Sequence, residues 1–82
     1  MSDSAKIADA EASFRVAIEA AHKQCAKFLE LRATTSLARL LASNGRRDEA
    51  HSMLAEIYNW FTEGFDTADL KNAKALLEEL AT

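Results

Sequence analysis

The chain has 82 residues, two glycines, no proline and a formal net charge of −3. A chain this short forms one domain at most, with a small core, and the near absence of glycine and proline favours helices over sheet. The acidic balance gives no electrostatic reason to expect a nucleic-acid partner, because phosphate binding needs a concentrated basic face.

The first predicted helix covers about residues 4–25. Its apolar side chains recur at spacings of three and four, which places them on one helical face. Val16 and Ala20 lie outside this face, which is typical of a helix with more than one neighbour. The predicted apolar face consists of Ile7, Ala10, Phe14, Ala17, Ile18, Ala21 and Cys25.

The second helix is predicted over about residues 28–43. No glycine or proline separates it from the first helix, so the break is placed between Cys25 and Phe28. Asn44 and Gly45 end the second helix, because both residues tolerate the left-handed conformation that closes a helix. Its apolar side consists of Leu37, Ala38, Leu40 and Leu41.

The third helix is predicted over about residues 47–61, after the charged run that begins at Arg46. Gly64 is expected to stop it, and Phe65 is placed for the apolar contact that often accompanies a glycine stop. The predicted buried stripe consists of Ala50, Met53, Leu54, Ile57, Tyr58 and Phe61.

The fourth helix is predicted over about residues 67–80, with Asp66 or Thr67 as its N-cap. Its predicted buried side consists of Leu70, Ala73, Leu77 and Leu80. No segment alternates like a strand, so four helices joined by short turns predict an all-α domain.

A pattern of side-chain size recurs between residue 10 and residue 50. In both places an alanine is followed by a large residue four positions later and by another apolar residue three positions after that. A period in this range is typical of a helical-repeat array, in which the small residue lets two helices approach closely. The two sets are Ala10, Phe14 and Ala17, and Ala50, Leu54 and Ile57.

The segment "TSLARLLASNGRRDEAHSMLAEI", residues 35–57, resembles a tetratricopeptide repeat. It has a Leu-small pair, a bulky residue three positions later, a turn glycine, and then small, large and apolar residues on the next helix. It departs from the family where Thr34 replaces an early aromatic residue and Thr62 replaces a closing proline. The resemblance implies an array of antiparallel helices: a lone second helix, one complete hairpin and a capping helix.

A second resemblance covers nearly the whole chain, and the segments "ELRATTSLARL" and "WFTEGFDTADLKNAKALLEEL" carry it most specifically. They are similar to the C-terminal tail of large bacterial signalling proteins of the adenylate/guanylate cyclase or ATPase type. The resemblance implies terminal repeats, and it implies neither activity for this chain. The sequence has no Gly-Lys-Ser/Thr phosphate loop and no metal-binding aspartate pair on a strand.

Metal-binding and catalytic residues are not predicted. His22 and Cys25 lie three positions apart, and His51 lies elsewhere, whereas zinc needs four ligands. A Cys25–His dyad would lack a third, orienting residue. We therefore expect no enzyme activity, no catalytic residue, no metal and no cofactor.

Four residues are candidates for binding a partner. Arg39, Arg46 and Arg47 concentrate positive charge, which fits either a solvated face or a docking patch for an acidic protein segment. A nucleic-acid surface is the alternative, although acidic residues follow Arg47 directly. Trp60 lies beside the buried stripe, so it either packs against the fourth helix or is an exposed binding anchor.

The first helix has no hairpin partner in the predicted array. Ile7, Phe14 and Ile18 should then leave apolar surface that needs cover, which predicts a homodimer. Cys25 is the single cysteine, no signal peptide is evident at the start, and no uncharged run approaches the roughly 20 residues of a membrane span. We expect a soluble cytoplasmic protein with no membrane contact.

Three functions follow as hypotheses. The first is a protein-interaction module that binds a helix or an extended peptide between the first and third helices. The second is a regulatory or oligomerising tail, or a free-standing remnant, of a cyclase- or ATPase-type signalling protein. The third is a small nucleic-acid-binding regulator.

Overall fold

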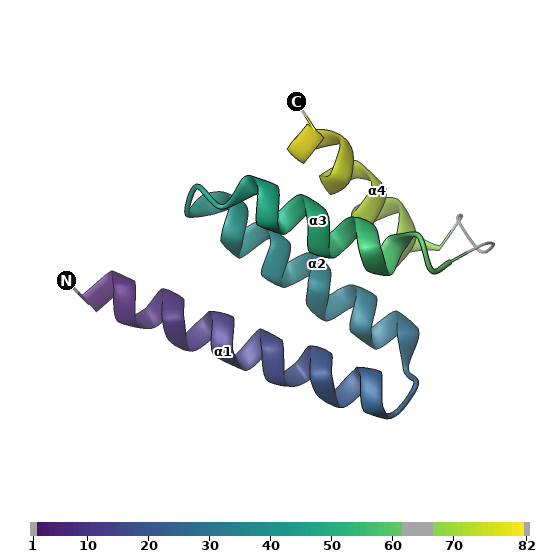
Figure 1. Cartoon of the computed structure of the whole chain (residues 1–82), viewed down its shortest axis with the longest axis horizontal. Helices are drawn as coiled ribbons and strands as arrows, with labels where there is room; N and C mark the ends of the chain where they lie inside the picture. Colours follow the sequence, from purple (N-terminus) through teal and green to yellow (C-terminus); the bar gives the residue numbers. More distant parts are fainter. Residues whose placement is uncertain (1, 62–66, 82) are drawn as a thin grey trace.

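The computed structural model describes residues 2–61 and 67–81, and these residues form α-helices joined by turns (Figure 1). The described residues contain no strand, so the predicted all-α fold is confirmed. The helices are α1 (Ser2–Lys23), α2 (Lys27–Ser43), α3 (Arg47–Tyr58) and α4 (Ala68–Ala81).

The helix α2 lies between the other three. It packs against α1, α3 and α4, while α4 also packs against α3 (Figure 1). Within the described residues α1 and α4 do not pack on each other, as the first and last helices of a closed bundle would. The principal extents of 43 × 32 × 18 Å describe a flat molecule. The arrangement is therefore an open array of helices.

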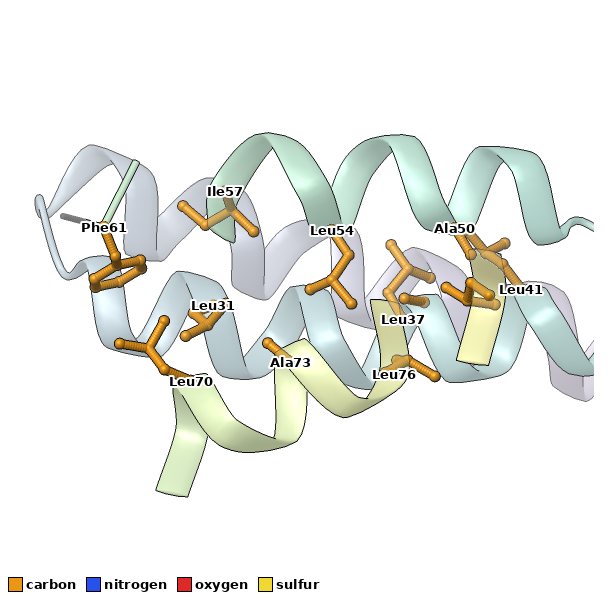
Figure 2. Packing of buried hydrophobic residues seen from close by; sticks show 12 residues of the cluster. Leu31, Leu37, Leu41, Ala50, Leu54, Ile57, Phe61, Leu70, Ala73 and Leu76 are labelled. Atoms are coloured by element: carbon orange, nitrogen blue, oxygen red, sulfur yellow. The ribbon is translucent and has the colours of Figure 1, made fainter. Parts of the chain in front are cut away.

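The hydrophobic core lies between α2, α3 and α4 (Figure 2). The largest fully buried side chains are leucines, which pack into the seams between these three helices. Ala50 and Ala73 are also fully buried, and small residues at such positions let neighbouring helices approach closely. The core cluster consists of Leu31, Leu37, Ala38, Leu41, Ala50, Leu54, Ile57, Phe61, Leu70, Ala73, Leu76 and Leu80.

The predicted stripes of α3 and α4 are confirmed with small rotations. In α3, Met53 and Tyr58 are only half-buried. In α4 the prediction missed Leu76, which is buried, and assigned its place to Leu77, which is half-buried. The buried face of α4 is rotated relative to the predicted face because this helix contacts both α2 and α3.

The helix α1 is attached less deeply than the others. Phe14 and Ile18 pack against the core while remaining partly exposed, and Ala21 is buried. The prediction was wrong for Ala17 and Cys25, which are exposed. Ala17 lies on the flank of the face that meets α2, and Cys25 lies beyond the end of the helix.

The helix α1 ends two residues earlier than predicted because Cys25 has a left-handed backbone, with φ of 58°. The N–H of Ala26 donates to the carbonyl oxygen of Ala21 at 2.9 Å, and the N–H of Cys25 donates to that of His22 at 3.1 Å. This pair of bonds is the Schellman motif. The motif was not predicted, because cysteine occupies the place where glycine is usual.

The end of α2 uses the same motif with the expected residue. Gly45 has φ of 78°, the N–H of Arg46 donates to the carbonyl oxygen of Leu41 at 2.9 Å, and the N–H of Gly45 donates to that of Ala42 at 3.3 Å. The predicted end of the second helix is confirmed.

The helix α3 ends at Tyr58 rather than at residue 61. The N–H groups of Trp60 and Phe61 donate to carbonyl oxygens three residues earlier, at 3.2 and 3.1 Å, which is a tight turn of the 3₁₀ type. The carbonyl oxygen of Thr67 accepts the first hydrogen bond of α4, from the N–H of Lys71 at 3.0 Å. The predictions for Gly64, Phe65 and Asp66 lie outside the described residues.

The two turns generate a prediction about stability. We expect Cys25→Gly to raise the free energy of unfolding by about 0.5–1 kcal/mol. Glycine removes the strain of the left-handed conformation, and its larger loss of backbone entropy on folding offsets part of this gain. Gly45→Ala should lower it by about 1–2 kcal/mol, and no heavy atom lies within 4 Å of the added methyl group, so backbone strain alone is tested. Urea denaturation measures both. Cys25→Ser is the control, and equal stability of the glycine and serine variants would contradict the prediction.

Candidate protein-interaction groove

An open groove of about 330 Å³ lies between α1 and α3 and has α2 as its floor. We call it the α1–α3 groove. The apolar lining residues belong to α1, to α3 and to the turn after α3, and most of the polar lining residues belong to the first half of α2. The lining residues are Ile18 and His22 of α1, Lys27, Glu30 and Thr34 of α2, Met53, Glu56 and Ile57 of α3, and Trp60 just after α3.

The floor of the groove contains Thr34, which is buried. This residue occupies the position where the tetratricopeptide resemblance would place an aromatic side chain. A threonine is much smaller than a phenylalanine or tyrosine, so space remains between Ile18 on one wall and Ile57 on the other. The position at which the sequence departs from the tetratricopeptide pattern thus lies in the lining of the groove.

Trp60 forms the exposed apolar wall at one end, with 57% of its surface accessible. The ammonium group of Lys27 lies 5.2 Å from the centre of the Trp60 ring, and Phe61 meets that ring edge-on at a centroid distance of 5.2 Å. Phe61 in turn lies 4.9 Å from the ring of Phe28. These contacts orient the indole before any partner arrives.

The polar residues at this end are paired with each other. One carboxylate oxygen of Glu30 lies 3.3 Å from Nζ of Lys27 and 3.4 Å from Nδ1 of His22. Lys27 therefore connects the carboxylate of α2 with the indole beyond α3. The carboxylate of Glu30 at this end of the groove is thus paired with the ammonium group of Lys27.

Four charged side chains, the ion-pair ring, join α1 to the beginning of α3. Glu11 accepts hydrogen bonds from Nε of Arg15 at 3.0 Å and from Nη1 of Arg46 at 2.7 Å. Glu49 accepts from Nε of Arg46 at 2.7 Å and lies 3.5 Å from Nη2 of Arg15. Arg15, Ile18 and His22 recur at spacings of three and four, so the ring and the groove follow one flank of α1.

The ion-pair ring changes the protonation equilibria of its members. The hydrogen bonds from Arg46 and then from Arg15 hold the pKa of Glu11 below its ordinary value. The hydrogen bonds to Glu11 and then to Glu49 raise the pKa of Arg46. Arg46, which was a predicted partner-binding residue, is thus already engaged with carboxylates.

The structure separates the four predicted partner-binding residues. Trp60 lines the α1–α3 groove, which supports its exposed alternative over packing against the fourth helix. Arg39 and Arg47 line a different hollow, between α2 and α4. Spacing along a helix predicts which residues share a face, and only the packing of helices decides which neighbour that face meets.

Two residues that line the groove, Lys27 and Met53, were not assigned to it from the sequence. Lys27 reaches Trp60 across a gap of more than thirty positions, and no local pattern links the two residues. Met53 was predicted to be buried, yet it is half-buried and lines the groove. A rule that places long, flexible methionine at binding surfaces would have pointed to it.

The residues weighed for metal binding do not converge. His22 pairs with Glu30, Cys25 is exposed, and His51 lines a separate hollow with Asp48. Among the residues that the structure describes, no group of three His, Cys, Asp or Glu side chains is placed to hold a metal ion. None of the helices in this same part of the chain is long and apolar enough to cross a membrane.

Comparison with known proteins identifies no relative: no family model, curated protein or solved structure matches this chain. The tetratricopeptide resemblance and the signalling-protein resemblance therefore stay predictions.

The lowered pKa of Glu11 generates a prediction about pH. In the pH range between its lowered value and 4.5, its ordinary value, the unfolded state binds more protons than the folded state. The stability that Glu11 contributes is therefore complete above 4.5 and is lost as the pH falls through the lowered pKa. We expect Glu11→Gln to have a flatter dependence of unfolding free energy on pH below 4.5 than the unmodified protein.

Urea denaturation at a series of pH values measures this difference. Glu19→Gln is the matched control, because among the described residues Glu19 pairs only with Lys23 of the same helix, at 3.3 Å. A Glu11→Gln profile parallel to that of the unmodified protein would show that the ion-pair ring does not stabilise the fold.

Proposed function

We propose that this chain is a non-enzymatic protein-interaction module of the tetratricopeptide type, which binds a helical or extended segment of another protein in the α1–α3 groove. The observation that carries the proposal is the pre-oriented, exposed indole of Trp60 at the end of an open groove with apolar walls. Tryptophan is enriched among the residues that dominate binding energy at interfaces.

The chemistry of the lining favours an amphipathic segment as the ligand. Ile18, Met53 and Ile57 offer apolar contacts to side chains that recur at spacings of three and four on a bound helix. Burial of apolar surface contributes about 25 cal/mol per Å². Because Lys27 and Phe61 already restrict the indole, little side-chain entropy is lost when a partner covers it.

The open arrangement of the helices supports the tetratricopeptide type. Repeat arrays leave the outer face of their terminal helices without neighbours, and Val16 on the outer face of α1 is 67% exposed. Ala50 is fully buried where α3 meets the core, as the small-residue pattern requires. Ala10 in the corresponding position of α1 is half-buried.

The second candidate function is a regulatory or oligomerising tail of a cyclase- or ATPase-type signalling protein. The exposed outer face of α1 supports it, because a preceding repeat would stack there. A neighbouring reading frame that encodes a cyclase or ATPase domain would favour this function. A nucleic-acid-binding role has less support, since Arg46 pairs with two carboxylates and Arg32 lies 3.3 Å from Asp69.

A peptide-display selection tests the interaction module. The unmodified protein would be used as bait for random peptides of about 15 residues, roughly four helical turns. Selected peptides would then be labelled and titrated by fluorescence anisotropy. We expect Trp60→Ala to weaken their binding at least about tenfold, which is the loss that truncation of a central aromatic anchor causes.

Two further variants make this test specific. Leu29→Ala removes another exposed apolar side chain that lies outside the groove lining, and it should leave binding unchanged. Thr34→Phe should fill the floor and block binding while circular dichroism confirms the helices. Peptides that bind Trp60→Ala as tightly as the unmodified protein, or no selected peptide at all, would refute the proposal.

The homodimer also stays a prediction, and the structure defines its test. The side chains of Ile7, Phe14 and Ile18 are half-buried against the α2 side, and α1 has 22 residues against 17 in α2, so its first turns project beyond α2. We expect sedimentation velocity at high micromolar concentration to show a dimer that Ile7→Asp dissociates. Val16→Asp, on the opposite face, is the control, and a monomeric unmodified protein would contradict the prediction.

A further inference from the structure

A second surface lies on the side of α2 opposite the α1–α3 groove, where α2 meets α4. It contains a hollow of about 420 Å³ and, beside it, a smaller one of about 60 Å³. Arg39 lines both hollows, so they form one continuous surface, which we call the arginine surface. The larger hollow is lined by Arg39, Ala42, Ser43, Arg47, Leu76, Glu79 and Leu80, and the smaller by Arg32, Thr35, Ser36, Arg39, Asp69 and Asn72.

The arginines of this surface differ from Arg46 in what they bind. The guanidinium of Arg39 has no ion pair or hydrogen bond with any residue that the structure describes. Arg47 donates from Nη2 to the main-chain carbonyl oxygen of Glu79 at 2.8 Å, which is a neutral acceptor. A guanidinium has five N–H donors, so both residues keep donors for a ligand.

The hydrogen bond to Glu79 also positions Arg47. It attaches the side chain to the last turn of α4, where free carbonyl oxygens favour a cation. The guanidinium is thereby held beside Leu76 and Leu80, which are the apolar floor of the larger hollow. A positive rim around an apolar floor fits a ligand that is both acidic and apolar.

We propose that the arginine surface binds an acidic amphipathic segment of a partner protein. Aspartate or glutamate carboxylates of the segment would pair with Arg39 and Arg47, and an apolar side chain between them would lie over Leu76 and Leu80. Planar guanidinium groups bind carboxylates with two parallel hydrogen bonds, which gives both strength and orientation. This surface is separate from the α1–α3 groove and binds independently of it.

The charge distribution favours a protein segment over a nucleic acid. Asp69 and Glu79 lie on the same surface as the arginines, and the whole chain has a net charge of −3. A phosphate backbone needs a continuous basic track and would be repelled by these carboxylates. A short acidic segment can instead place its carboxylates at Arg39 and Arg47 alone.

The test uses the whole chain and a labelled helical peptide of about 12 residues, roughly three turns, with leucines on one face and glutamates on the other. We expect saturable binding by fluorescence anisotropy at low salt. Arg39→Gln combined with Arg47→Gln should weaken it at least about tenfold, because both charge-assisted, two-point hydrogen-bonded pairs are lost together. The same peptide with glutamine in place of glutamate should not bind.

Matched controls keep the result specific. Lys74→Gln removes an exposed cation from the opposite side of α4, and Trp60→Ala alters only the groove, so neither should change the affinity. If the double variant does not fold, Arg39→Gln alone carries the test, because the guanidinium of Arg39 loses no partner among the described residues. An undiminished affinity in the variant, absence of binding to the unmodified protein, or tighter arginine-dependent binding of a single-stranded DNA oligonucleotide would overturn the proposal.

Discussion

The packing of the three other helices on α2 is the constraint on which the rest of the structure depends. Leu31, Leu37 and Leu41 are almost completely inaccessible, and the helix to which they belong packs against α1, α3 and α4. Truncation of one such leucine costs about 2–5 kcal/mol, which is comparable with the whole stability of many small domains. Both surfaces described above are seams of this one helix, so the packing that stabilises the fold also determines where ligands can bind.

The way in which α1 packs against the core explains why the α1–α3 groove stays open. Phe14 and Ile18 are the larger apolar side chains that hold α1 to the core, and both stay partly exposed. The ion-pair ring joins α1 to the start of α3. Towards Trp60, the apolar side chains of α1 and α3 that line the groove are Ile18, Met53 and Ile57. Exposed ion pairs are weak and are screened by salt, so the width of the groove depends mainly on these apolar contacts and on the small Thr34.

Particular residues show how far the sequence could predict this structure. Periodicity predicted four helices, with ends that differ from those of the structure by up to three residues, since one buried face is enough to produce spacings of three and four. Residue type located the Gly45 turn, because glycine favours the left-handed conformation. The end of α1 was misplaced, because Cys25 adopts the same conformation although cysteine rarely does. Leu76 was missed for a different reason: a helix with two neighbours buries a wider face than one stripe.

The sequence by itself determined the helical class, the approximate extent of each helix and the presence of an unusual tryptophan beside a buried stripe. These properties follow from local geometry, in which each residue is related to others three and four positions away. Only the tertiary structure decided that Trp60 meets Lys27, that Arg46 is engaged with Glu11, and that Arg39 and Arg47 share a surface with α4. Those pairings join residues that are distant along the chain, and they depend on how each helix is rotated against its neighbours.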